Sequence, residues 1–250
     1  MDGLWTKTSI LLGVFCLAVY SGGAFGQRKT TTVLVASPMQ SRTPSLRFPR
    51  VSGLPDAEIQ RQVNEVLADR EKKDFQRLRD CSDVLQYQFP GAKNEDSETM
   101  RVMYLTPHYL SVDARLTVWQ CGMHPDVNIP IPLTVDLRSG HEVDWKQFFA
   151  DGFLPVQDYS VRRKPQTVPT AKLTLLYLSL YKQTDPQCVS AVKDDISYGY
   201  DLWLDGSRKA LVVVPDFPHV IRVCADEIAI PLSVVLPYIA DEATARDLAR

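Results

Sequence analysis

A thiol, an imidazole and a carboxylate lie within six residues of one another in the stretch WQCGMHPD, residues 119–126. Residues of these types can bind a metal ion, or can pair a thiolate nucleophile with an imidazole base. They can also form a turn that presents side chains to a partner, because Gly122 allows a tight bend and Pro125 stiffens its exit. Each of these three possibilities predicts different surroundings for the loop.

A metal site would need further ligands at a suitable spacing. His108, His124, His141 and His219 are scattered along the chain, and no two of them are spaced as i, i+4 on a predicted helix. Zinc sites usually show tighter ligand spacing than this. We therefore expect neither a metal ion nor another cofactor. The net charge of −2 comes without a basic stripe, so we expect no nucleic-acid partner.

The N-terminus has the composition of a secretory signal peptide. Lys7 precedes an apolar run over residues 10–20, and small residues follow over residues 21–26. The apolar run is shorter than the roughly 20 residues that a membrane-spanning helix needs. We expect residues 1–26 to be removed, leaving a secreted or periplasmic protein that is not integral to a membrane. A retained anchor is the alternative, because Asp2 cancels the charge of Lys7.

Four cysteines remain after the leader: Cys81, Cys121, Cys188 and Cys224. In an exported protein an even number favours two disulfide bonds over free thiols. Three pairings are possible, and we prefer Cys81–Cys121 with Cys188–Cys224, because each half of the chain then closes its own loop. A disulfide-bonded Cys121 has no thiolate to act as a nucleophile, which favours the turn over a Cys–His catalytic pair.

The elements before and after the loop have to position it. Residues 27–50 are expected to be extended, with a strand over the β-branched run 31–35. An apolar period of 3.6 residues predicts a long helix over residues 56–79. Strands are predicted over residues 83–90, 100–105, 109–119 and 128–137. The third of these alternates apolar and polar side chains, which is typical of a half-buried antiparallel strand. The loop therefore lies between two strands.

The second half of the chain alternates helices and strands. Residues 138–141 predict a turn, and Asp144 is expected to cap a short helix. Residues 151–169 read as a linker or an exposed loop. Helices are predicted over residues 170–183, around Cys188 and over residues 233–239. A hairpin turning at Asp205-Gly206 joins strands 198–204 and 211–214, and residues 221–224 and 227–231 are expected to be extended.

These elements predict an α+β fold with a mostly antiparallel sheet, a long N-terminal helix and helices packed on one face. We expect one domain over residues 51–240, which the segment 151–169 could divide into two subdomains. Residues 241–250 are expected to form a C-terminal tail.

Three stretches, in this order, resemble one family. They are Gly53-Leu54-Pro55-Asp56 at a helix start, the strand and loop of residues 109–125, and Ile230-Pro231-Leu232-Ser233 near the end. Between the last two lie Val135-Asp136-Leu137-Arg138-Ser139-Gly140 and the short helix of residues 145–149. Together they resemble the extracytoplasmic domain shared by the anti-sigma factor RsiV and the peptidoglycan deacetylase PdaC. The resemblance covers most of residues 50–240, and it departs at Cys121, where the family has a glycine.

The resemblance implies an α+β fold and a non-catalytic domain that binds a partner in the cell envelope; the domain of RsiV binds lysozyme. Neither sigma-factor signalling nor deacetylation is expected of this chain. We expect the partner to be a protein, such as a lysozyme-like wall-cleaving enzyme, or peptidoglycan itself. The alternative is a cell-wall or ester hydrolase that uses His124 and Asp126. The residues expected to bind the partner are Gly122, Met123, His124, Pro125 and Asp126.

Overall fold

The computed structural model describes residues 34–36, 48–88, 90–91, 97–118, 126–155, 171–195 and 199–250. All of them belong to the unit Thr31–Arg250. In chain order the elements are β1 Leu34–Ala36, β2 Arg50–Ser52, α1 Ala57–Gln88, β3 Ser97–Leu105, β4 Tyr109–Val118, β5 Asp126–Asp136, β6 His141–Glu142, α2 Trp145–Phe148, α3 Lys172–Leu180, α4 Pro186–Asp195, β7 Tyr200–Asp205, β8 Ala210–Pro215, η2 His219–Cys224, β9 Ile228–Pro231, α5 Leu232–Val235, η3 Leu236–Tyr238 and α6 Glu242–Leu248. Within the described part, no helix combines the length and the apolar character needed to span a membrane.

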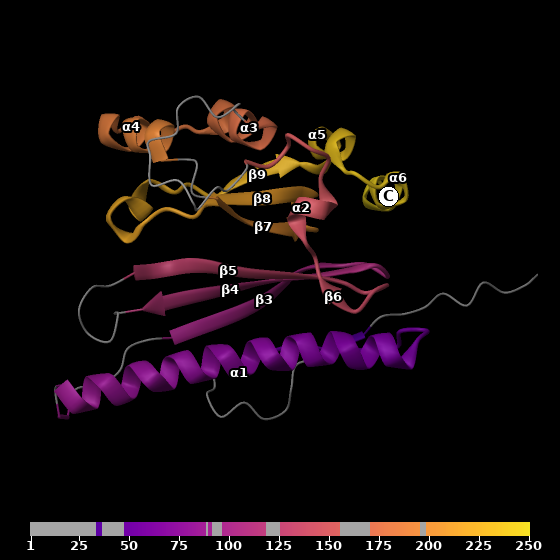
Figure 1. The fold of residues 1–250 in the computed structure, drawn as a ribbon, viewed down its shortest axis with the longest axis horizontal. Coiled ribbons are helices and arrows are strands. Elements are labelled where there is room, and N and C mark those ends of the chain that lie inside the picture. Colours follow the sequence, from indigo (N-terminus) through magenta and orange to yellow (C-terminus); the bar gives the residue numbers. More distant parts are fainter. Residues whose placement is uncertain are drawn as a thin grey trace, which may run out of the picture. The chain divides into compact units, whose positions relative to one another are not determined.

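The strands of the described residues form three antiparallel sheets, which together with the helices confirm the α+β prediction. The sheets have the orders β1-β2, β3-β4-β5-β6 and β7-β8-β9. We call the four-stranded sheet the first sheet and the three-stranded sheet the second sheet. Helix α1 runs along one face of the first sheet, and the second sheet lies against the opposite face of the first sheet (Figure 1).

Helix α1 begins where its sequence provides a cap. The backbone N–H groups of Glu58 and Ile59 donate to Asp56 Oδ1 over 2.8 and 3.1 Å, which satisfies donors that the first helical turn leaves unpaired. The apolar stripe of the helix then buries Val63 and Leu67 against β4 and β5. The 3.6-residue period therefore predicted both the helix and the face that it buries.

The strand predicted over residues 83–90 is wrong, because α1 continues to Gln88. Extending an existing helix by one residue costs little compared with starting a new element. Two apolar side chains of this stretch, Val84 and Tyr87, are exposed on the helix. A short alternating run is therefore weak support for a strand when a strong helix precedes it.

Strand β4 is buried on both faces, not on one as predicted. Leu110 and Val112 pack against α1, while Ser111 and Asp113 on the other face are buried as well. The second sheet covers this polar face: the backbone N–H of Leu204 on β7 donates to Ser111 Oγ over 3.2 Å. The alternation of β4 showed which side chains share a face, but it could not show that a second sheet covers the polar one.

The second sheet is held on its other side by α3 and α4. Leu173 and Tyr177 of α3 belong to the same hydrophobic core as Leu211 and Val213 of β8. A disulfide bond joins Cys188 on α4 to Cys224 at the end of η2, in agreement with the pairing preferred from the sequence. The hairpin at Asp205-Gly206, the turn before β6 and the Asp144 cap of α2 are also confirmed.

Two further predictions need correction. Residues 221–224 are not extended but belong to the 3-10 helix η2. A stretch of four residues is too short for its apolar pattern to distinguish a strand from a turn. Residues 241–250 are not a tail. Asp241 accepts a hydrogen bond from the backbone of Thr244 over 2.7 Å and caps α6, and Leu248 enters the main core.

Candidate binding site between the two sheets

The predicted docking loop lies almost entirely outside the described residues. This holds for Gly122, Met123, His124 and Pro125, and also for the Cys81–Cys121 pairing, because Cys121 is not described. Asp126 is the first residue of β5, and its backbone pairs with Val118, the last residue of β4. Both strands therefore lead into the loop at the same end of the first sheet.

A cavity of about 310 Å³ opens between the two sheets close to this end. Arg115 pairs with Pro130 across β4 and β5, and Leu116 pairs with Ile129, only a few residues from the strand ends. We call this cavity the inter-sheet cleft. Its lining residues are Arg115, Ile129 and Pro130 from the first sheet, and Asp201, Val214, Pro215, Asp216, Arg222, Ala225, Asp226 and Glu227 from the second sheet and η2 with their connections.

The alternation of β4 and β7 explains why polar side chains meet here. Ser111, Asp113 and Arg115 share the face of β4 that the second sheet covers, and the guanidinium of Arg115 lies 5.3 Å from the centre of the Trp203 ring. Asp201 and Trp203 lie two residues apart on β7 and so share the face that looks toward the first sheet. The cleft is therefore the open end of a polar layer between the sheets.

Carboxylates outnumber guanidinium groups in the inter-sheet cleft, four to two. Glu227 is neutralised, since Arg115 and Arg208 contact its two oxygens over 2.6 and 2.7 Å. The second guanidinium, that of Arg222, donates to the backbone carbonyl of Phe217. The carboxyl groups of the other three acids have no hydrogen bond or ion pair within the described part of the chain. These are Asp201, Asp216 and Asp226.

Asp201 is the acid whose ionisation the cleft changes most clearly. Burial raises the pKa of its carboxyl to about 7, the negative charge of Asp216 adds to the rise, and Arg222 opposes it. Near neutral pH this carboxyl therefore exists in both protonation states. Such a group can donate a proton, or can bind a cation when it is ionised, and strongly shifted acids in a cavity are candidates for functional residues.

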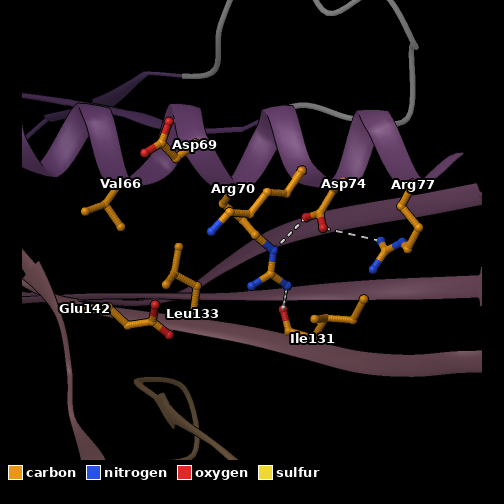
Figure 2. Close-up of a pocket in the computed structure, with 9 residues that line it drawn as sticks. Val66, Asp69, Arg70, Asp74, Arg77, Ile131, Leu133 and Glu142 are labelled. Carbon is orange, nitrogen blue, oxygen red and sulfur yellow. Dashed lines mark hydrogen bonds and ion pairs between the residues drawn. The ribbon is translucent and has the colours of Figure 1, made fainter. Parts of the chain in front are cut away.

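A second cavity, of about 380 Å³, lies between α1 and β5 (Figure 2). Asp74 is only 4% exposed, and it accepts from Arg70 Nε over 2.7 Å and contacts Arg77 over 3.4 Å. Arg70 also donates to the backbone carbonyl of Ile131 on β5 over 3.0 Å. Figure 2 shows Arg70 reaching from the helix to the strand through this network. We assign the cavity a structural role, since its buried carboxylate holds Arg70, and Arg70 joins the helix to the sheet.

Asp74→Ala is therefore expected to lower the free energy of unfolding by about 2–3 kcal/mol, because it leaves two guanidinium groups without their shared carboxylate. Urea denaturation of the purified protein measures this. Asp69→Ala is the matched control: it is an exposed acid on the same helix and cavity, and a change within about 0.5 kcal/mol is expected. Equal effects of the two substitutions would contradict the structural role of the network.

A third polar cluster ties α6 to the first sheet. His108 Nδ1 contacts Asp247 of α6, and Tyr109 shares a hydrogen bond of 3.2 Å with Thr244. Arg138 is bound by both oxygens of Asp136 and also contacts Tyr109. These contacts join elements that pack together, and neither of the two cavities described above adjoins them. We therefore assign this cluster to the docking of α6.

In the described ranges, no group of three or more His, Cys, Asp or Glu side chains could hold a metal ion. No sequence motif singled out the cleft acids Asp201, Asp216 and Asp226. One signal could have suggested part of the cleft: Asp201, Trp203 and Asp205 alternate with apolar residues, as the polar residues of β4 do. Strands with polar residues at every second position can belong to two sheets whose polar faces pack together. The sequence patterns of β4 and β7 do not show that these two faces do so.

No family model and no curated protein matches the sequence. Among solved structures, a member of the DUF3298 family from Bacteroides fragilis is similar over 81% of this chain and 86% of its own length. The two chains are 13% identical, and the TM-score is 0.49. A similarity of this size supports no inference about function or about individual residues.

Proposed function

We propose that this chain is an exported binding protein of the cell envelope, whose partner docks at the end of the first sheet where β4 and β5 lead into residues 119–125. The inter-sheet cleft at that end is the observation that carries the proposal. Binding sites are usually cavities with a few converging polar groups, and this cleft gathers three carboxyl groups that form no hydrogen bond or ion pair in the described part of the chain.

Export is supported by two independent features. The N-terminal sequence has the parts of a signal peptide, and the Cys188–Cys224 disulfide is of a kind that persists in oxidising compartments. The motifs that resemble the RsiV and PdaC domain support a cell-envelope partner. On that basis the partner is a wall-cleaving enzyme such as lysozyme, or peptidoglycan.

A hydrolase is the second candidate, because of one observation. Asp201 has a pKa of about 7 and lies in a cleft beside a second acid, Asp216. A carboxyl that is protonated near neutral pH can act as a general acid. In this alternative the reaction would cleave a cell-wall or ester bond, with His124 and Asp126 contributed by the loop.

Pull-down of the protein without residues 1–26, once with immobilised lysozyme and once with purified sacculi, tests the binding proposal. We expect one of the two to retain the wild-type protein, and His124→Ala to weaken the retention. The binding proposal expects the His124 side chain at the surface, and truncation of a surface side chain usually alters stability by less than about 0.5 kcal/mol. The melting temperature of this variant should therefore stay unchanged.

The same protein samples are then assayed for hydrolysis of peptidoglycan and of a simple ester. No retention by lysozyme or sacculi would reject the binding proposal. Hydrolytic activity that disappears in both His124→Ala and Asp201→Asn would establish the enzyme instead. Binding without hydrolysis would leave the enzyme unsupported.

A further inference from the structure

The 3-10 helix η2 exposes two apolar side chains beside the inter-sheet cleft. Val220 and Val223 are 83% and 85% exposed, and Arg222 between them lines the cleft. We call the segment Val220–Val223 the valine turn. Single exposed apolar residues are common on protein surfaces, but two on one short turn beside a cavity with unpaired carboxyl groups are a candidate contact surface.

The valine turn is held in place by several contacts to its surroundings. Cys224, which follows it directly, is joined by the disulfide to Cys188 on α4, and its backbone carbonyl accepts a hydrogen bond of 3.0 Å from the Tyr181 hydroxyl. Arg222 donates twice to the Phe217 carbonyl, over 3.2 and 3.1 Å. Two valines held in this way lose little conformational freedom when a partner covers them, which favours binding.

The charge beside the valine turn selects the kind of partner. Asp216 precedes the turn and Asp226 follows it, and neither carboxyl has a cationic partner in the described part of the chain. A lysine or arginine side chain is complementary to this pair. An anionic lipid surface is not, because the carboxylates would repel it, and a glycan strand offers no apolar side chain to cover the valines.

We infer that the valine turn and the carboxylates of Asp216 and Asp226 form one docking surface for a protein segment in which a lysine or arginine lies beside apolar side chains. The cation enters the inter-sheet cleft while the apolar neighbours cover Val220 and Val223. The inference rests on the proposed binding function and narrows it, since it selects a protein partner over peptidoglycan.

The test uses capped synthetic peptides in which one lysine lies between two leucines. Two altered peptides serve as probes, one with norleucine in place of the lysine and one with serines in place of the leucines. Binding to the protein without residues 1–26 is measured by calorimetry or by NMR titration. We expect the parent peptide to bind about tenfold more tightly than either altered peptide, because each lacks one half of the complementary surface.

Matched protein variants assign the effect to this surface. Asp216→Asn with Asp226→Asn should remove the preference for lysine over norleucine, and Val220→Ser with Val223→Ser should remove the preference for leucine over serine. Each pair should weaken binding of the parent peptide about tenfold. The controls are Asp151→Asn and Val234→Ser, which change an exposed acid and an exposed valine away from the cleft and should leave binding unchanged.

The outcomes separate this inference from the proposed function. Retention by lysozyme or sacculi without any peptide preference would leave the proposed function standing and overturn the docking surface. The inference also fails if the valine variants lose binding to phosphatidylcholine vesicles but not to the peptide, or if they abolish self-association of the chain. These variants alter exposed side chains, except at the half-buried Asp226, where asparagine has nearly the same size and shape. Unchanged circular dichroism spectra are therefore expected and establish that the fold is intact.

Discussion

Replacing Asp201 with asparagine is expected to stabilise the fold at about pH 8 by up to about 4 kcal/mol. Burial, together with the charge of Asp216, raises the pKa of this carboxyl from 3.8 to about 7. The folded state therefore holds the proton more tightly than the unfolded state. The stability that the protonated carboxyl contributes is fully present below about pH 4 and is lost as pH rises toward and through 7. One pKa unit corresponds to about 1.4 kcal/mol, which sets the size of the loss.

Urea denaturation of the wild type and of Asp201→Asn at several pH values between about 4 and 8 measures this prediction. Asparagine cannot ionise, so its advantage should be small at the acid end and should grow steadily with pH. Asp151→Asn, an exposed acid outside the cleft, is the control and should show no such trend. A pH-independent difference between Asp201→Asn and the wild type would contradict the raised pKa that burial gives this carboxyl in the cleft.

Removing the Cys188–Cys224 disulfide is expected to lower the free energy of unfolding by about 4 kcal/mol. The two cysteines are 36 residues apart, and the chain-entropy model gives a loss of this size for the loop that they close. The double variant Cys188→Ala with Cys224→Ala removes this disulfide alone, whereas a reductant would also break any other disulfide in the protein. It should also loosen the valine turn, because Cys224 anchors that turn to α4.

Thermal and urea denaturation of the double variant measure the stability loss. Thiol titration of the unfolded wild type, without a reductant, should find no free thiol in the protein that lacks residues 1–26. Two titratable thiols that peptide mapping assigns to Cys81 and Cys121 would reject the predicted Cys81–Cys121 pair, whose residues are not both described, and leave Cys188–Cys224 intact. Four titratable thiols, or a double variant as stable as the wild type, would reject the structural disulfide.

The elements that local sequence signals define were predicted well. The start of α1 follows from the Asp56 cap and the apolar period, and the β7–β8 hairpin follows from Asp205-Gly206. Each of these signals involves residues a few positions apart. The same reasoning placed β4 and β5 on either side of the WQCGMHPD loop.

The inter-sheet cleft could not be predicted, because it depends on contacts between distant segments. Arg115 and Glu227 are 112 residues apart and meet only because the second sheet covers β4. Asp201 resembles an ordinary surface acid in the sequence, and its unusual pKa arises from burial and from Asp216. Asp126, a predicted site residue, lies at the same end of the first sheet as the cleft. This proximity results from tertiary structure, and no spacing in the sequence indicates it.

Hydrogen–deuterium exchange with and without a bound partner tests the docking site most directly. The probe is lysozyme, or muropeptides released from sacculi if lysozyme is not retained in the pull-down. The account predicts slower exchange over residues 126–131 and 214–227 in the complex, and unchanged exchange along the cavity-facing part of α1, residues 66–77. Slower exchange confined to α1 or α6, or no change with either probe, would contradict the placement of the partner at the inter-sheet cleft.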